Sequence, residues 1–183
     1  MLSNLKKQRM QKLSLIAAII ALSSLMVMAQ TPSVISAHPD FSGVWKWEAK
    51  GASPRELAVT HGTERIEFVE SFEFEKKPFS NTTILFTDKR GEKNILRIPN
   101  SDFDSEVTSR TYWRKDKLIR SSTYSTPVET GAERFLIHHS DVETYSLSKD
   151  GNILTVERVS RVATPFSDNL PPSMGKRVFV RKQ

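Results

Sequence analysis

The chain has 183 residues, no cysteine, and 27 lysines and arginines against 21 aspartates and glutamates. This length fits a single domain, and the absence of cysteine excludes disulfides, cysteine metal sites, thiol catalysis and lipid attachment at a cysteine. Four of the basic residues lie in the first 12 positions, which contain no acid, so the remaining chain has 23 basic and 21 acidic residues and a formal charge of about +2 instead of +6. This near-balance argues against nucleic acid as a partner.

Residues 1–29 predict a secretory signal peptide with a signal helix. The four basic residues precede an apolar run over residues 13–28, which ends in the cleavage-site pattern Val27-Met28-Ala29. The predicted mature chain therefore begins near Gln30, and we expect it to be periplasmic or secreted. An uncleaved signal anchor is the alternative, and the only expected link to a membrane, although the run is shorter than the roughly 20 residues that span a bilayer. Residues 30–39, which include two prolines, are predicted to be a flexible leader.

The first predicted strand follows this leader. Gly43, Trp45 and Trp47 fall on every second residue, so in a strand they share one face, with Val44 and Lys46 on the other. The missing side chain of Gly43 lets a sheet bend sharply there, and Trp45 is large enough to plug one end of a closed sheet.

Alternating runs predict further strands along the rest of the chain. The longest run places Ile66, Phe68, Phe72 and Phe74 on one face, interrupted by Glu70. Glu70 therefore marks a buried acid, a bulge or the mouth of a barrel. Thr126 to Ala132 is predicted to be a loop. The other predicted strands are Glu56–Thr60, Asn81–Thr87, Asn94–Ile98, Ser105–Trp113, Leu118–Tyr124, Arg134–His139, Glu143–Ser148, Asn152–Val162 and Lys176–Arg181.

No segment after residue 30 has a convincing helical period. A two-layer sandwich and a barrel both fit the strand count, but the unbroken succession of hairpins, such as the turn at Asp150-Gly151, favours an up-and-down barrel. We therefore predict an all-β, antiparallel barrel of about 8 to 10 strands over residues 40–183. Such a barrel encloses either packed side chains or one small ligand.

Aromatic residues on the faces expected to point inward are the candidate ligand contacts, because aromatic linings suit flat or acyl ligands. The alternative is that these rings pack together as a solid core. Ser109 and Thr111 share a face with one of them, which favours a wet cavity unless that face is the solvent side. The candidates are Trp47, Phe68, Phe86, Trp113 and Tyr145.

The sequence contains no constellation that predicts catalysis, and we expect no metal or cofactor. His138 and His139 are adjacent on a predicted strand, so their rings point to opposite faces and cannot readily share one ion. His139-Ser140-Asp141 resembles a triad only in its order along the chain, whereas triads are assembled across a fold. Glu70 has no second carboxylate placed opposite it, so hydrolysis of the two-carboxylate type is not predicted.

Residues 163–175 form the one irregular insertion between the last two predicted strands. The segment contains three prolines and the apolar residues Phe166, Leu170 and Met174. A loop of this length in a small domain is typically functional or mobile. The alternative function is therefore a solid-cored protein-interaction module that uses residues 163–175.

Gly43-Val44-Trp45, together with the succession of strands and a basic last strand, resembles the lipocalin and broader calycin pattern. The segments Asp40 to Trp45, Tyr112 to Leu118 and Glu143 to Val156 are similar to small exported bacterial lipocalin-like proteins. This resemblance implies a barrel that binds a small apolar or amphiphilic molecule and is not an enzyme.

The resemblance also implies how the barrel is closed at one end. In that family the tryptophan of the first strand packs beneath a basic side chain of the last strand. The matching residues here are Trp45 with Arg177 or Arg181, next to Gly43. A contact of this kind between a cation and a ring contributes about 0.5 to 2 kcal/mol, depending on its exposure to solvent.

Overall fold

The computed structural model describes residues 38–49, 53–130, 133–167 and 170–183. The chain divides into two units, Met1–Ile35 and Ser36–Gln183. The predicted signal peptide, its cleavage site and most of the predicted leader lie outside the described residues. Within the described ranges there is no helix of the length and apolarity needed to cross a bilayer.

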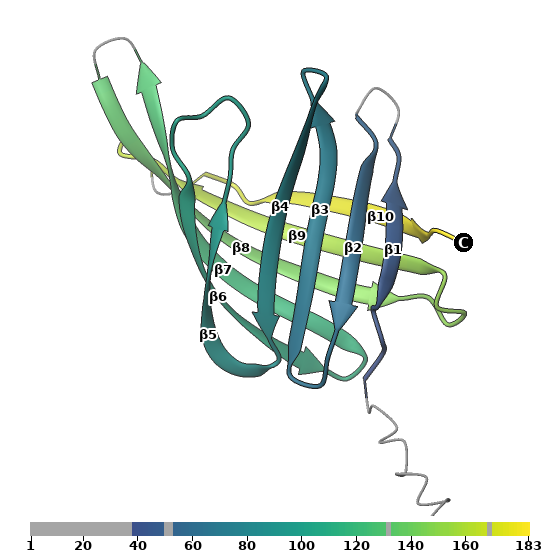
Figure 1. Cartoon of the computed structure of the whole chain (residues 1–183). Coiled ribbons are helices and arrows are strands. Elements are labelled where there is room, and N and C mark those ends of the chain that lie inside the picture. The colour runs from purple at the N-terminus through teal and green to yellow at the C-terminus, as the bar shows by residue number, and fades with distance from the viewer. Residues whose placement is uncertain (1–37, 50–52, 131–132, 168–169) are drawn as a thin grey trace, which may run out of the picture. The chain divides into compact units, whose positions relative to one another are not determined.

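Ten antiparallel strands form one sheet in the second unit (Figure 1). Their order in the sheet is β4-β3-β2-β1-β10-β9-β8-β7-β6-β5, so the first and last strands pair with each other. This confirms the predicted all-β, up-and-down barrel, which is nearly closed. The strands are β1 Gly43–Trp47, β2 Arg55–His61, β3 Arg65–Phe74, β4 Lys77–Phe86, β5 Asp88–Leu96, β6 Ser105–Arg114, β7 Lys117–Thr130, β8 Glu133–Leu147, β9 Ile153–Ala163 and β10 Ser173–Arg181.

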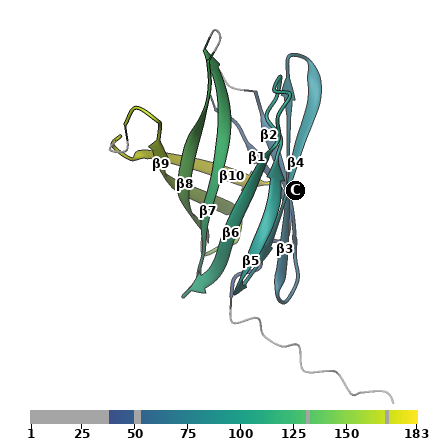
Figure 2. The same ribbon diagram turned by 90° about the vertical axis from the view of Figure 1, so that its left-hand side faces the viewer.

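The barrel has two curved walls that cross each other. Strands β1 to β4 stand side by side in the foreground of Figure 1, and β8 to β10 run obliquely behind them. The view in Figure 2, turned by 90°, separates the wall that contains β7 and β8 from the wall that contains β3 and β4. Residues that point inward from these two walls therefore face each other.

The edges of the sheet, β4 and β5, meet at a seam that is closed by two asparagine side chains. Asn94 of β5 donates from Nδ2 to the Ile84 carbonyl (2.9 Å) and accepts from the Ile84 amide (2.7 Å). Asn81 of β4 makes the same pair of bonds with the backbone of Arg97, at 3.1 and 2.9 Å. Side-chain amides thus provide hydrogen bonds that a backbone ladder provides elsewhere in the sheet.

Two predictions between residues 126 and 142 were wrong: a loop, and a break between two strands. The predicted loop from Thr126 to Ala132 begins instead as part of β7, which continues to Thr130. Pairing of β6 with β7 ends at Thr123, so Pro127 lies on an edge, where proline is tolerated. The two predicted strands on either side of residues 140–142 are one strand, β8, because these residues pair with both neighbouring strands.

An apolar core fills one end of the barrel around Trp45, which is fully buried. The guanidinium of Arg181 lies 4.3 Å from the centre of the Trp45 ring. It also donates to the carbonyls of Ser42 (2.7 Å) and Gly151 (3.0 Å) and so joins the first strand to the turn before β9. Of the two partners that the resemblance implied for Trp45, Arg181 is the one in contact.

Candidate functional site

A cavity of about 500 Å³ occupies the lumen beyond the apolar core. This volume lies within the range of roughly 300 to 1,000 Å³ that is typical of small-molecule sites. Of the five candidate ligand contacts, Trp47, Phe68 and Tyr145 line the cavity, and Phe86 and Trp113 are not among its lining residues.

Phe86 and Trp113 have other surroundings. The guanidinium of Arg90 lies 3.9 Å from the centre of the Phe86 ring. Trp113 belongs to a stack of rings at the closed end of the barrel, with centroid distances of 4.4 Å to His38, 5.5 Å to Phe41 and 5.8 Å to His61. Trp113 therefore contributes to the closed end and not to the lining of the cavity.

One side of the cavity, formed by β1 to β3, carries several large apolar side chains together with the charged Arg55 and Glu70. The guanidinium of Arg55 lies 4.3 Å from the centre of the Phe72 ring and 5.8 Å from that of Trp47. We call the apolar residues of this side the apolar wall. Its rings are held by neighbours on both sides, since Phe68 stacks on Tyr145 at 5.2 Å and Phe72 packs against Phe79 at 5.1 Å. The apolar wall consists of Trp47 of β1, Leu57 of β2, and Phe68 and Phe72 of β3.

The opposite side carries mostly polar and charged side chains, and we call it the polar wall. Strand register explains why they gather. Asp141 is opposite Ser122 and Ser160, and Glu143 in the next inward-pointing row is opposite Arg120 and Arg158. The polar wall consists of Arg120, Ser122 and Tyr124 of β7, Asp141, Glu143 and Tyr145 of β8, and Arg158 of β9.

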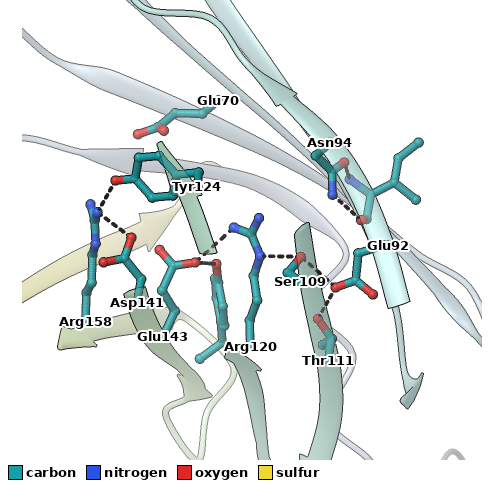
Figure 3. Close-up of polar contacts among 12 residues, drawn as sticks. Glu70, Glu92, Asn94, Ser109, Thr111, Arg120, Tyr124, Asp141, Glu143 and Arg158 are labelled. Carbon is teal, nitrogen blue, oxygen red and sulfur yellow. Dashed lines mark hydrogen bonds and ion pairs between the residues drawn. The ribbon is translucent and has the colours of Figure 1, made fainter. Parts of the chain in front are cut away.

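A continuous network of hydrogen bonds joins the polar wall to β5 and β6 (Figure 3). Tyr145 and Arg120 both donate to Oε2 of Glu143, at 3.0 and 3.1 Å. Arg120 Nε donates to Ser109 Oγ (3.2 Å), and Ser109 donates in turn to Oε1 of Glu92 (2.9 Å). Ser109 and Thr111 are buried, so their face of β6 is not the solvent side, but neither residue is among those that line the cavity.

Arg158 anchors a second polar group. Its Nη2 donates to Oδ2 of Asp141 (2.6 Å) and to the hydroxyl of Tyr124 (2.9 Å), as Figure 3 shows. Two buried atoms of this ion pair, Oδ1 of Asp141 and Nε of Arg158, have no hydrogen-bond partner among the described residues. The pair therefore keeps one unused acceptor and one unused donor at the edge of the cavity.

Glu70 lies inside the barrel and not at a bulge, because β3 keeps an unbroken register with both neighbours. Its Oε1 accepts from Arg177 (2.7 Å) and Arg55 (3.0 Å), and all three residues line the cavity. We call this group the Glu70 cluster. Arg177 was a candidate for the contact with Trp45, but it lies in this cluster instead.

Burial and charge set the protonation of the polar wall. Burial raises the pKa of Tyr145 far above its usual value, and the neighbouring Glu143 adds to the shift. Burial alone would lower the pKa of Arg120, but Tyr145 and Glu143 more than offset it, so that pKa is raised. The same balance, with Asp141 as the main partner, raises the pKa of Arg158. Tyr145 is therefore a neutral donor, and both arginines are charged.

The order His139-Ser140-Asp141 does not form a triad. His139 and Asp141 are on the inward side of β8, whereas Ser140 is exposed on the other side. His139 stacks on Tyr124 at 4.5 Å and shares a hydrogen bond with Thr126, and His138 pairs with Ser125 on the opposite face. In the part of the chain that the structure describes, no three histidine, aspartate or glutamate side chains gather as a metal site would require.

Sequence reasoning missed most of the polar wall. One signal was present, since Asp141 and Glu143 have the same strand parity as Tyr145, which was expected to point inward. Arg120 and Arg158 carried no such signal, because arginines in strands usually face solvent. Their inward positions follow from pairing with these two acids across the strands.

Comparison with known proteins adds no assignment to this geometry. No protein-family model matches the chain, and no curated protein matches it.

Proposed function

We propose that this protein is an exported, lipocalin-like, non-catalytic barrel that binds one small amphiphilic molecule in its lumen. The observation that carries the proposal is a cavity of about 500 Å³ between an apolar wall and a polar wall. A ligand with both kinds of surface buries its apolar part against Trp47, Phe68 and Phe72 and places its polar part against the opposite side. Export is supported by the signal-like pattern of residues 1–29.

The three tryptophans offer a direct test. Only Trp47 lines the cavity, whereas Trp45 is buried in the core and Trp113 lies in the ring stack at the closed end. Titration with 1-decanol should therefore shift the tryptophan emission of the wild-type protein and of Trp113→Phe. The shift should be largely lost in Trp47→Phe. A response that disappears in Trp113→Phe and survives in Trp47→Phe, or no binding of any amphiphile by calorimetry, contradicts the proposal.

A second candidate function uses the surface around residues 163–175. Phe166 and Met174 are 78% and 84% exposed, and Leu170 is exposed as well. Exposed apolar side chains that lie close together in sequence favour a contact with a partner protein. The predicted insertion is shorter than expected, because its last three residues, Met174 among them, belong to β10. In this alternative the exposed surface of residues 163–175 carries the function, and the lumen is only structural.

The double variant Phe166→Ser, Met174→Ser tests this alternative. If the loop is the functional surface, proteins recovered by cross-linking and pull-down with the wild type should be lost with the variant, while 1-decanol binding is unchanged. An identical set of recovered proteins rejects this alternative.

A further inference from the structure

Every charged side chain that lines the cavity is paired with an opposite charge. The polar wall contains two arginines and two acids, each arginine paired with one acid. The Glu70 cluster contains two arginines that share one carboxylate. The lining thus holds four arginines, Arg55, Arg120, Arg158 and Arg177, and three acids, Glu70, Asp141 and Glu143.

The pairing of every lining charge disfavours an ionic ligand. An anion that approached Arg120 or Arg158 would also meet the acid that each arginine already holds. An anion beside Arg55 and Arg177 would meet Glu70, which lies 3.0 Å or less from both guanidinium groups. A cation would meet the arginines in the same way. In either case the charge of the ligand is desolvated without a free counter-ion, which is unfavourable.

The unused hydrogen-bonding atoms point to another kind of group. Oδ1 of Asp141 is a buried acceptor, and Nε of Arg158 is a buried donor, and neither has a partner among the described residues. A hydroxyl group both donates and accepts, so one such group can satisfy this pair. The side chain of Arg158 is 41% exposed, against 5% for Asp141, so the arginine can swing aside to admit a ligand.

We infer that the lumen selects a neutral, hydroxyl-bearing amphiphile over an anion or a cation of the same size, and that the hydroxyl pairs with Asp141 and Arg158. This inference rests on the proposed function and specifies its ligand class. The apolar wall holds the hydrocarbon part, and the ion pair holds the alcohol. Selectivity comes from the absence of an unpaired charge among the residues that line the cavity.

A matched series of ten-carbon probes tests the inference on the wild-type chain. The probes are 1-decanol, decanoate and decylamine, titrated by calorimetry at pH 7.5. We expect 1-decanol to bind at least ten-fold more tightly than either ion. If decanoate or decylamine binds as tightly as 1-decanol, the inference is overturned while the proposed function stands. If none of the three binds, the proposed function itself fails.

The substitution Asp141→Asn tests the location. It removes one negative charge from the polar wall and keeps the side-chain shape, so Arg158 loses its carboxylate partner and the lumen becomes more positive. Binding of decanoate should become tighter and binding of 1-decanol weaker, which changes their affinity ratio at least five-fold. Glu157→Gln is the matched control, because Glu157 is exposed on the outer face of β9 beside Lys176 and should leave the ratio unchanged.

Each result of the variants counts for or against the site. If the ratio of the decanoate affinity to the 1-decanol affinity changes in Asp141→Asn and not in Glu157→Gln, the result supports the pairing of the hydroxyl with Asp141 and Arg158. If this ratio is unchanged in both variants, or changes equally in both, the result contradicts the pairing. If Asp141→Asn does not fold, the wild-type series still decides the ligand class, and Arg158→Lys, which retains the charge but removes Nε, should weaken 1-decanol binding at least three-fold.

Discussion

At the scale of single residues, the closed end of the barrel depends on the close approach of Gly43 and Arg181. Gly43 has a φ of +134°, and a Cβ placed there would lie 2.7 Å from Nη1 of Arg181. A side chain at this position would therefore have to displace the guanidinium that covers Trp45. Glycine is therefore favoured at position 43 for two reasons: it tolerates the positive φ, and it leaves space for the guanidinium that packs on the Trp45 ring.

Gly43→Ala should lower the free energy of unfolding by about 1 to 3 kcal/mol, because the variant is strained in φ and crowds Arg181. The measurement is urea denaturation followed by circular dichroism. Gly175→Ala is the control, since a Cβ at that position meets no atom within 4 Å; its effect should stay within about 0.5 kcal/mol. Equal losses in the two variants would contradict the role given to Gly43.

His61 at the same end makes stability depend on pH. Burial lowers its pKa, although the neighbouring Asp40 acts in the opposite direction. Its Nδ1 accepts a hydrogen bond from the Phe41 amide (3.2 Å), which requires the neutral ring. A histidine whose pKa is lower in the folded state stabilises the fold fully above its unfolded pKa of about 6.5. That contribution is lost as the pH falls through the folded pKa.

The urea midpoint of the wild-type protein should therefore fall between pH 7.5 and pH 5. In His61→Asn the fall should be smaller, because the asparagine oxygen can still accept from the Phe41 amide but does not titrate. His139, whose pKa is also lowered by burial, accounts for a part of the fall that remains in this variant. Identical pH profiles of the wild type and His61→Asn would refute the role of His61.

At the scale of elements, the seam between β4 and β5 lacks the backbone ladder that joins neighbouring strands in the rest of the sheet. Elsewhere each strand pairs with two neighbours, but these two strands are the ends of the sheet order. Asn81 and Asn94 bridge them, three residues apart along each strand, and both line the cavity. A seam held by side chains, and not by a continuous ladder, should open more easily than the rest of the sheet.

Hydrogen exchange can locate this opening. In Asn94→Ala the amide of Ile84 loses its acceptor and should exchange about ten-fold faster, as expected from a net loss of roughly 1.4 kcal/mol. The amide of Arg97, held by Asn81, should change little. Asn81→Ala should give the reverse pattern, so that each variant is the control for the other. Uniform acceleration of both amides in both variants would mean that the two bridges are not independent.

At the scale of the whole molecule, two crossing walls of different chemistry enclose one lumen, so the amphiphile that we propose as its ligand would touch strands that are far apart in the sequence. Phe68 of β3 and Tyr145 of β8 stack across the cavity at 5.2 Å. A ligand between the walls therefore stabilises the complete barrel and not one hairpin, since its contacts exist only when both walls are formed.

Saturation with 1-decanol at about 100 times its dissociation constant should raise the free energy of unfolding by about 2.7 kcal/mol, which corresponds to roughly 5 to 10 °C in Tm. Far-UV circular dichroism and tryptophan fluorescence should report the same shift. Different midpoints from the two probes would show that the walls unfold separately. No shift at a concentration that calorimetry finds saturating would contradict binding in the lumen.

The sequence by itself determined the strands with strong alternation and favoured the barrel class, because a period of two is a local pattern. The contact of Trp45 with the last strand was implied by the resemblance alone, and the structure decided for Arg181 over Arg177. The sequence did not show that β7 passes through Pro127, since only the pairing of neighbouring strands makes that position an edge. Strand register also decided that Arg120 and Arg158 lie opposite Glu143 on the two strands next to β8, where Arg158 also reaches Asp141. The tertiary structure alone therefore produced the polar wall, because a buried arginine is stable only beside an acid from another strand.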